Sequence, residues 1–292
     1  MHYKKTLGNQ IFTIVNCFLL IVVSIACIFP ILHILAISFS SKTAVNGGMV
    51  TFLPVDFTTE AYKFVANGKE FYLSFIVSVK RTILGVIINM FFTVTAGYAL
   101  SKSKQKFSAR NGYMWFFIIT MLFSGGLIPG YLVVSKLNLI DTVWALILPG
   151  AVPVYYLILF QNFVKTLPEE ITESAYIDGA REMTVLTRMI LPLSKPILAT
   201  LILFNAVNHW NSWFDGMIYM NRPQNYPLQT YLQTIVVEIN LKAVNSISDI
   251  TSISEKNSRA AQIILAMLPI VVVYPFLQKY FTKGIVLGSV KG

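Results

Sequence analysis

Long runs without Asp, Glu, Lys or Arg dominate this chain. Six of them have 19 residues or more, and a helix needs about 20 apolar residues to cross a bilayer. The six runs are Thr6–Ser41, Thr82–Ser101, Asn111–Ser135, Thr142–Val164, Pro196–Phe214 and Ala260–Gln278. Only 12% of the 292 residues are charged, 55% are hydrophobic and the mean hydropathy is +0.65. Since a soluble domain carries about 25% charged residues, we predict an all-α polytopic membrane protein.

We expect one membrane domain over residues 1–292 with six transmembrane helices. Their predicted bounds are about 11–40, 74–101, 112–135, 142–164, 196–219 and 259–280. The first run is too long for the hydrophobic region of a signal peptide, and we expect its helix to bend at Pro30. Gly125-Gly126 either breaks the third span or marks its outer end. The run 223–237 is short and holds two prolines, which indicates a loop.

The cations are distributed unevenly between the two sides of the predicted bundle. An even number of spans places both termini on one side, and that side holds 13 of the 23 Lys and Arg but only five of the 13 Asp and Glu. Cytoplasmic loops carry an excess of Lys and Arg, so we predict that both termini are cytoplasmic. The net charge of +10 is therefore a topology signal and not evidence of nucleic-acid binding.

The chain offers little for chemistry of its own. Cys17 and Cys27 lie ten residues apart on one predicted helix, about 15 Å along its axis, which is too far for a disulfide. Three widely spread His make no metal cluster, and no Ser–His–Asp or Cys–His arrangement can be argued. The phosphate-binding pattern G-x-x-x-x-G-K-[ST] does not occur in the sequence. We expect no catalytic residue, no metal site and no cofactor bound by this chain.

The segment 165–196 between the fourth and fifth spans is hydrophilic and carries a net charge of −1. Thr166-x-x-Glu169 is a capping-box pattern and predicts a short helix that ends near Asp178. Gly179 then permits a sharp turn. A second amphipathic stretch over 181–190 follows, and it places three apolar side chains on one face. These are Met183, Leu186 and Ile190.

Three interpretations of this segment compete. A DNA-binding helix-turn-helix is unfavourable because the net negative charge repels phosphate. An amphipathic helix on the membrane surface is usually rich in Lys and Arg on its polar face, and this segment is not. Its small and acidic residues favour a docking element for another protein, in which small side chains permit close approach to a groove.

The same residues carry a resemblance. Glu173-Ser-Ala-x-x-Asp178-Gly179-Ala180, followed by Ile190-Leu-Pro192 and Pro196, resembles the EAA signature of the membrane subunits of ABC importers, with Ser174 where the family has Ala. Trp210-Asn-Ser-Trp-Phe214 and the C-terminal stretch 283–292 resemble carbohydrate-type permeases of the MalG-like kind. The match in topology covers essentially the whole chain. Within that group the chain most resembles the branch that serves lipo-oligosaccharides and polyuronides such as alginate and pectin fragments.

The resemblance implies an ABC importer type I permease fold whose coupling helices, the EAA loop at 166–192, sit in a cleft of an ATP-binding subunit. It implies that ATP and Mg belong to that partner. The other implied partners are a second, homologous permease, a second ATP-binding subunit and an extracytoplasmic solute-binding protein, in a bacterial cytoplasmic membrane. The implied coupling residues are Glu173, Ala175, Asp178, Gly179, Arg181, Glu182 and Pro192.

Polar residues inside a span are costly in lipid and usually face a cavity or a partner helix. The fifth span is richest in them, and positions 208, 211 and 215 share one helical face by their spacing. Amides can bond sugar hydroxyls and aromatic rings can stack on sugar C–H faces; interhelical bonding with an aromatic belt is the alternative, which we favour for Asn89 and Gln161. The candidate pathway residues are Asn205, Asn208, His209, Trp210, Asn211, Trp213 and Asp215.

The leading hypothesis is therefore a non-enzymatic importer permease that handles a saccharide. A membrane-embedded enzyme is the first alternative, with Asp215 and His209 as its only candidate pair. A self-contained secondary transporter is the second, although six spans are few and no internal repeat is evident. An acidic saccharide is compatible with the net charge of the outer half, which includes Lys80, Arg81 and Arg259 near membrane level.

Overall fold

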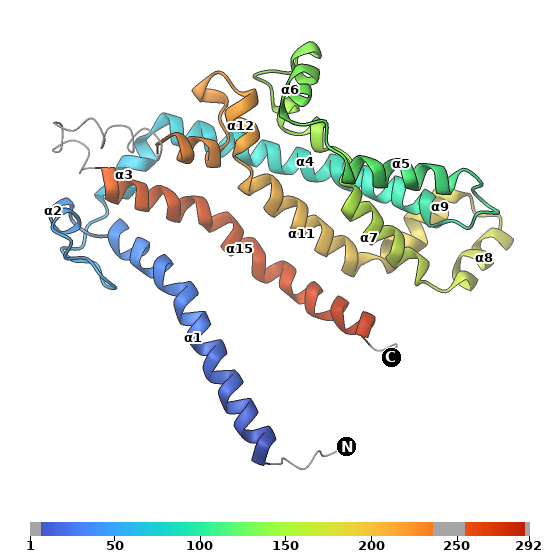
Figure 1. Cartoon of the computed structure of the whole chain (residues 1–292), viewed down its shortest axis with the longest axis horizontal. Coiled ribbons are helices and arrows are strands. Elements are labelled where there is room, and N and C mark those ends of the chain that lie inside the picture. Colours follow the sequence, from blue (N-terminus) through green and yellow to red (C-terminus); the bar gives the residue numbers. More distant parts are fainter. Residues whose placement is uncertain (1–6, 236–254, 290–292) are drawn as a thin grey trace. The chain divides into compact units, whose positions relative to one another are not determined.

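The computed structural model describes residues 7–235 and 255–289, and every regular element within them is a helix (Figure 1). Three of these helices are long and apolar enough to cross a membrane, and the number rises to six when each bent pair counts as one span. The predicted all-α membrane fold is therefore confirmed. The chain divides into two compact units. Unit 1 comprises Met1–Lys69 and Val236–Met267, and unit 2 comprises Glu70–Ile235 and Leu268–Gly292.

Unit 1 begins with α1 (Leu7–Ser38), which continues through Pro30 as a single helix. The side chains of residues 8–32 are all exposed, as suits a helix that is surrounded by hydrocarbon. After α1 the chain folds into two short helices, α2 (Lys42–Asn46) and α3 (Glu60–Asn67). A small apolar core forms where the end of α1 meets the following loop. It contains Ala36, Ala44, Val45 and Val50.

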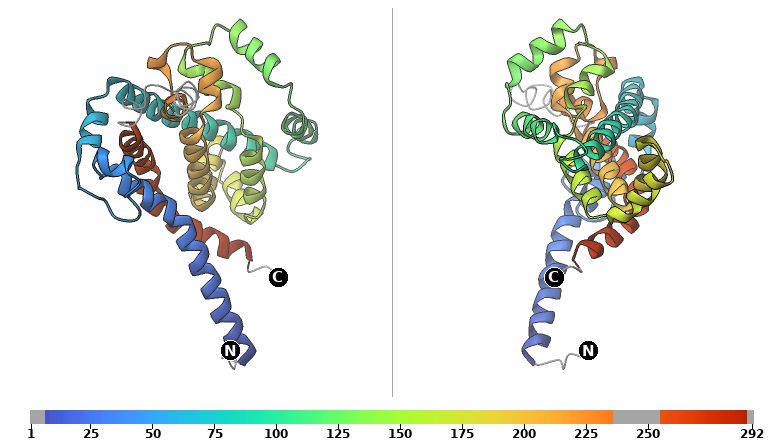
Figure 2. Two further views of the ribbon diagram at one scale, coloured as in Figure 1. Left: turned by 60° about the vertical axis from the view of Figure 1, so that its left-hand side comes forward. Right: turned by 90° about the vertical axis from the view of Figure 1, so that its right-hand side faces the viewer.

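Unit 2 is built along α4 (Lys69–Ser101), against which α7 (Val154–Lys165) and α11 (Lys195–Asn211) pack (Figures 1 and 2). One stripe of α4 is buried and is made mainly of small or polar residues at a spacing of three to four. Small residues allow membrane helices to approach closely. A Cβ atom on Gly97 would lie 2.9 Å from Cδ1 of Phe160 on α7, and one on Gly85 would overlap the ring of His209 on α11. The stripe comprises Ser74, Ser78, Arg81, Gly85, Asn89, Thr93 and Gly97.

The third predicted span is broken in its middle. Helix α5 (Arg110–Leu122) and helix α6 (Leu127–Lys136) meet at an angle of 113°. Gly126 adopts a φ of 88°, which an L-residue with a side chain rarely takes, so the glycine pair is a break and not simply an outer end. In the fourth span the short helices η1 (Val143–Leu146) and η2 (Leu148–Gly150) precede α7, with a bend of 49°.

The fifth predicted span, 196–219, is not one helix either. Helix α11 ends at Asn211, and α12 (Phe214–Tyr219) begins after a two-residue break. The expectation that 208, 211 and 215 share one face is therefore wrong for Asp215, which belongs to α12. The loop expected at 223–237 is also wrong in part. A turn, η4 (Pro223–Asn225), is followed by helical residues 228–235, whose first turn begins at Pro227, where a missing N–H costs nothing.

The segment after α7 forms α8 (Glu169–Ile177), α9 (Glu182–Val185), the π-helical turn η3 (Leu186–Ile190) and α10 (Leu191–Leu193). The predicted capping box is absent, because Thr166 caps the end of α7 and donates its hydroxyl to the Phe163 carbonyl at 2.7 Å. The shared apolar face is also wrong in part. Leu186 and Ile190 are buried, but Met183 is 65% exposed, since the π turn changes the helical repeat.

The last helix, α15 (Glu255–Ser289), contains Pro269 and Pro275 and covers the predicted sixth span. The C-terminal stretch 283–292, which contributes to the family resemblance, lies beyond the side chains that the structure describes.

Candidate functional site

The turn between α8 and α9 is fixed by Gly179. This residue has a φ of 79°, its N–H donates to the Tyr176 carbonyl, and the N–H of Ala180 donates to the Ala175 carbonyl at 2.9 Å. These bonds close the end of α8 as in the glycine-terminated C-caps of many helices. No atom lies within 4 Å of the position that a Cβ on Gly179 would take. A side chain there is therefore strained by the backbone and not by a clash within this chain.

Most of the predicted coupling residues lie on the surface around this turn. Two apolar side chains stand beside them, because Ile177 is 85% exposed and Met183 is 65% exposed. Ala175 is the exception, since it is buried in the core beneath α8. The surface thus combines acidic, basic and apolar groups, as a protein-docking surface does. The exposed coupling residues are Glu173, Asp178, Gly179, Arg181, Glu182 and Pro192.

Glu182 connects the predicted coupling segment, residues 166–192, to the end of α4. Its carboxylate forms an ion pair with Lys102 at 2.8 Å and accepts hydrogen bonds from the hydroxyls of Tyr98 at 2.6 Å and Tyr176 at 2.8 Å. Lys102 in turn donates to both tyrosine oxygens. Partial burial acts to raise the pKa of Glu182, but the bonds from Lys102 and the tyrosines outweigh it, so the pKa lies below its ordinary value.

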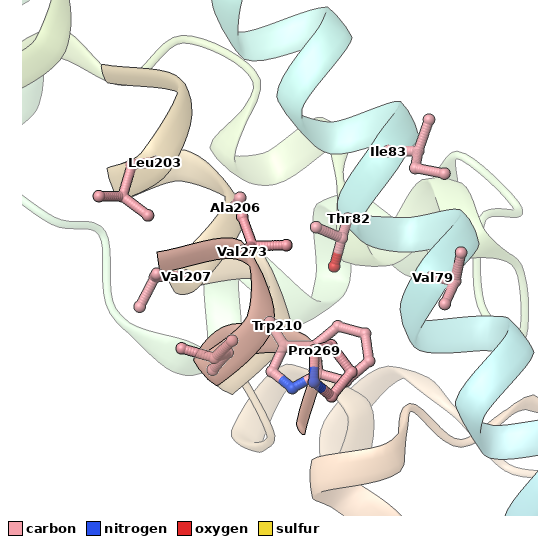
Figure 3. A pocket seen from close by; sticks show the side chains of 10 residues that line it. Val79, Thr82, Ile83, Leu203, Ala206, Val207, Trp210, Pro269 and Val273 are labelled. Carbon is pink, nitrogen blue, oxygen red and sulfur yellow. The ribbon is translucent and has the colours of Figure 1, made fainter. Parts of the chain in front are cut away.

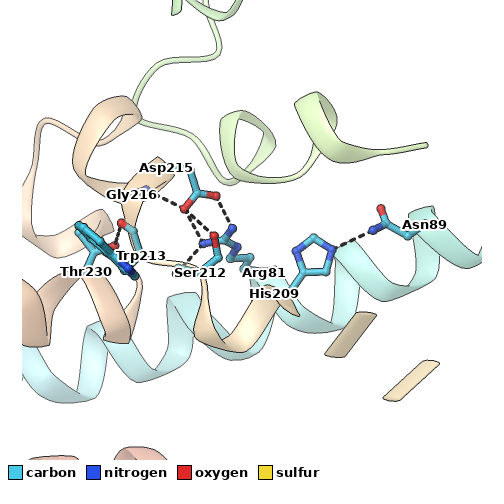
Figure 4. A network of polar contacts seen from close by, with 8 residues as sticks. All are labelled: Arg81, Asn89, His209, Ser212, Trp213, Asp215, Gly216 and Thr230. Atoms are coloured by element: carbon cyan, nitrogen blue, oxygen red, sulfur yellow. Dashed lines mark hydrogen bonds and ion pairs between the residues drawn. The ribbon is translucent and has the colours of Figure 1, made fainter. Parts of the chain in front are cut away.

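The second polar cluster lies inside the bundle of unit 2, at the break between α11 and α12 (Figure 4). Arg81 on α4 forms an ion pair with Asp215 and also donates to the Ser212 carbonyl at 3.2 Å. Thr230 donates to the Trp213 carbonyl at 2.7 Å. The Ser212 carbonyl at the break therefore has a side-chain partner, and the Trp213 carbonyl accepts both Thr230 and the Met217 N–H. Satisfied backbone groups are the condition for non-helical backbone at membrane depth.

Beside this break, α4 and α11 are joined by a buried set of polar side chains. The amide nitrogen of Asn89 donates to Oδ1 of Asn205 at 2.9 Å and lies 3.2 Å from Nε2 of His209. All three residues are at most 5% exposed. Gln161 on α7 similarly donates to the Leu100 carbonyl at 3.0 Å. Asn205 and His209 thus have interhelical partners, which is the alternative role that the sequence left open.

The remaining candidate pathway residues divide by exposure. Asn208, Asn211 and Trp213 are exposed, whereas Trp210 is 6% exposed. Trp210 lines a cavity of about 170 Å³ between α4, α11 and α15 (Figure 3). Apart from Thr82, the other residues that line this cavity are apolar, and they include Val79, Leu203 and Val273. This cavity therefore suits hydrocarbon and not a hydroxyl-rich ligand.

Between α6 and η1, Asp141 organises a turn that the sequence did not single out. Its carboxylate accepts the N–H groups of Asn221 at 3.1 Å and Arg222 at 3.2 Å, and the side-chain amide of Asn225 at 3.1 Å. Arg222 also pairs with it at 3.3 Å. Partial burial raises the pKa of Asp141, but these bonds outweigh it and lower the pKa.

The chain has relatives of similar length among known proteins. The chain is 42% identical to Protein LplC of Bacillus subtilis (strain 168) over all of its length and 98% of that protein. It is 36% identical to the Polygalacturonan/rhamnogalacturonan transport system permease protein YtcP of the same organism, over 97% of this chain and 99% of YtcP. No family model matches the chain.

A solved structure agrees with these relatives. A chain from the crystal structure of a bacterial ABC transporter involved in the import of the acidic polysaccharide alginate superposes with a TM-score of 0.87 and 32% identity, covering 96% of this chain and all of that one. The protein is thus a membrane-spanning transport subunit of the ABC class. It belongs to the permease subunits of carbohydrate ABC transporters, which are multi-pass and non-catalytic.

Proposed function

We propose that this permease forms one half of the translocation pathway for an acidic oligosaccharide built of uronate units. Its similarity to YtcP and to the alginate importer carries the proposal, because polygalacturonan, rhamnogalacturonan and alginate all contain uronate units. Each likeness extends over at least 96% of the chain, so it is not confined to the coupling signature. The second half of the pathway would come from a homologous permease.

The charge argument from the sequence needs one correction. Arg81 is buried and committed to Asp215, so it does not provide a cation for a substrate. Lys80, its neighbour on α4, is exposed and can do so. Asn208, Asn211 and Trp213 provide amides and a ring that suit hydroxyls and sugar C–H faces. We assign these three exposed residues to the pathway, with Asp215 at its edge through its partly exposed carboxylate.

We further propose that 166–192 couples the permease to two ATP-binding subunits, which hold ATP and Mg. The support is geometric. The turn at Gly179 is exposed and is flanked by Ile177 and Met183. The Lys102–Glu182 ion pair connects the segment that contains this turn to the end of α4. A movement of this turn is transmitted to α4 through that pair. In this arrangement the termini are cytoplasmic, and a solute-binding protein docks on the opposite face.

A neutral oligosaccharide is the competing substrate. The chain is 27% identical to an arabinooligosaccharide permease, AraQ of Halalkalibacterium halodurans, over 92% of its length. The enzyme alternative has lost its candidate pair, because His209 and Asp215 have separate partners, Asn89 and Arg81.

The substrate is tested with the assembled transporter in proteoliposomes. We expect its ATPase activity to rise more with a binding protein loaded with galacturonate or alginate oligomers than with one loaded with arabino-oligosaccharides. The comparison is repeated with Asn208→Ala and Asn211→Ala, which should reduce the stimulated rate and leave the basal rate unchanged. An equal response to neutral and acidic oligomers would contradict the acidic proposal.

The coupling role is tested with Gly179→Trp. The expected result is loss of the ATP-binding subunit from a pull-down on a tagged permease, with the permease still inserted in the membrane. Gly48→Trp is the matched control, because Gly48 also has a positive φ, of 66°, and open space around its Cβ position. Retention of the ATP-binding subunit by Gly179→Trp would reject the docking surface.

A further inference from the structure

A polar cavity of about 510 Å³ lies beside α8, where the ends of α4 and α7 meet the loop 102–110. Its volume falls within the range of roughly 300–1,000 Å³ that is typical of small-molecule sites. Four cations line it, against two acids, Glu169 and Glu173, on the α8 side. The four cations are Lys102, Lys106, Arg110 and Lys165.

Three of these cations form no ion pair among the described residues. Lys102 pairs with Glu182, but in the part of the chain that the structure describes Lys106, Arg110 and Lys165 form no ion pair. Lys106 Nζ lies 5.0 Å from the centroid of the Tyr176 ring, and Lys102 Nζ lies 5.3 Å from the same centroid. Two ammonium groups therefore lie close to the same aromatic ring.

Arg110 gives the most specific indication that this cavity binds an acceptor group. One of its terminal nitrogens donates to the Lys102 carbonyl at 3.3 Å, and its Nε is buried without a hydrogen-bond partner among the described residues. A buried guanidinium donor without a partner is costly, and a bound acceptor would remove that cost. Ser103 also lines the cavity and adds a hydroxyl donor, whereas the hydroxyls of Ser101 and Thr172 donate to the carbonyls of Tyr98 and Glu169.

We propose that this cavity binds a phosphate group. Guanidinium and ammonium groups that converge in a concave site bind phosphate oxygens through short, charge-assisted hydrogen bonds. The cavity lies at the ends of three membrane-spanning segments, and basic pockets in such places bind phospholipid headgroups. The phosphate comes from an anionic phospholipid headgroup or from a free phosphate compound. Binding here does not depend on which saccharide is transported.

The test uses the full chain purified in detergent. Inorganic phosphate is titrated by isothermal calorimetry, and retained phosphatidylglycerol is compared with phosphatidylcholine by native mass spectrometry. We expect Arg110→Gln and Lys165→Gln each to weaken binding about tenfold, which corresponds to about 1.4 kcal/mol. Lys104→Gln is the matched control: it removes the same charge from the same loop, but Lys104 does not line the cavity, and its affinity should equal that of the wild type.

The outcomes separate the two sources. A preference for phosphatidylglycerol that both cavity variants lose identifies a lipid headgroup. Phosphate binding that they lose, without a lipid preference, identifies a free phosphate compound. Lys165 lies on a different helix from Arg110, so Lys165→Gln still tests phosphate binding where Arg110→Gln lowers the yield of folded protein. The proposal is overturned when neither probe distinguishes the wild type from the two variants, or when a galacturonate trimer binds and phosphate does not.

Discussion

Two ion pairs attach α4 to the rest of unit 2, and they differ in their exposure to solvent. The side chains of Arg81 and Asp215 are 3% and 24% exposed, whereas those of Lys102 and Glu182 are 15% and 59% exposed. The inner pair stabilises a helix break, so its loss leaves a buried charge and free backbone groups. The outer pair is screened by water, so its ionic attraction alone contributes little to stability. Its strength comes from the two tyrosine hydroxyls that it shares.

The largest effect is expected at the inner pair. Asp215→Ala leaves Arg81 buried and unpaired, which should lower the free energy of unfolding by about 3–5 kcal/mol. The double variant Arg81→Met/Asp215→Leu should recover most of this loss, because it removes both charges. Unfolding of the detergent-solubilised chain by SDS measures both. Equal stability of Asp215→Ala and the wild type would remove the distinction between the pairs.

A third ion pair, Asp141–Arg222, tests whether solvent exposure alone determines how much an ion pair contributes to stability. The side chain of Asp141 is 18% exposed and that of Arg222 is 71% exposed. Asp141→Ala should cost about 1–2 kcal/mol, because it leaves the N–H groups of Asn221 and Arg222 without an acceptor, whereas the Asn225 amide keeps its bond to the Asp141 carbonyl. Arg222→Ala should cost under about 0.5 kcal/mol. The same unfolding assay applies, and equal costs for the two variants would show that the pair and not the turn carries the stability.

The outer pair should show a pH dependence of definite sign. Because the pKa of Glu182 is lower in the folded chain than its ordinary value of 4.5, its ionised form stabilises the fold at higher pH. That contribution is expected to be full above about pH 4.5 and to fall as the pH drops through the folded pKa. The difference in melting temperature between the wild type and Glu182→Gln should shrink accordingly. A difference that grows on acidification would contradict this sign.

A small effect is expected from a single tyrosine of the outer cluster. Tyr176→Phe removes one hydrogen bond to Glu182 and one from Lys102, at a partly exposed site, so it should cost about 0.5–1 kcal/mol. Tyr113→Phe provides a control, since Tyr113 is exposed and its ring merely stacks on Phe107. Limited proteolysis of 166–192 would detect the loosened segment, and identical digestion of both variants would argue against anchoring by Tyr176.

Sequence patterns predicted the all-helical membrane fold because hydrocarbon imposes the same local requirement on each apolar run. They predicted the turn at Gly179 for a similar reason, since a positive φ is a property of one residue. The break between α11 and α12 was not predicted, because it depends on distant partners. The carbonyls after Asn211 are bonded by Arg81, 131 residues away, and by Thr230. The roles of Tyr98 and Lys102 were not predicted for the same reason. Their bonds to Glu182 and Tyr176 span 84 and 74 residues of sequence.

The bare surface of α1 has a consequence for how this protein accumulates substitutions. No side chain in its most apolar window is buried against the rest of the chain, so one apolar residue there can replace another without creating a cavity. Drift in α1 is therefore limited by overall hydropathy and helix length. Along α4, by contrast, Gly85 and Gly97 admit no larger side chain without displacing His209 or Phe160. Comparison of orthologues should find α1 variable in sequence and conserved in composition, and these two glycines fixed in place.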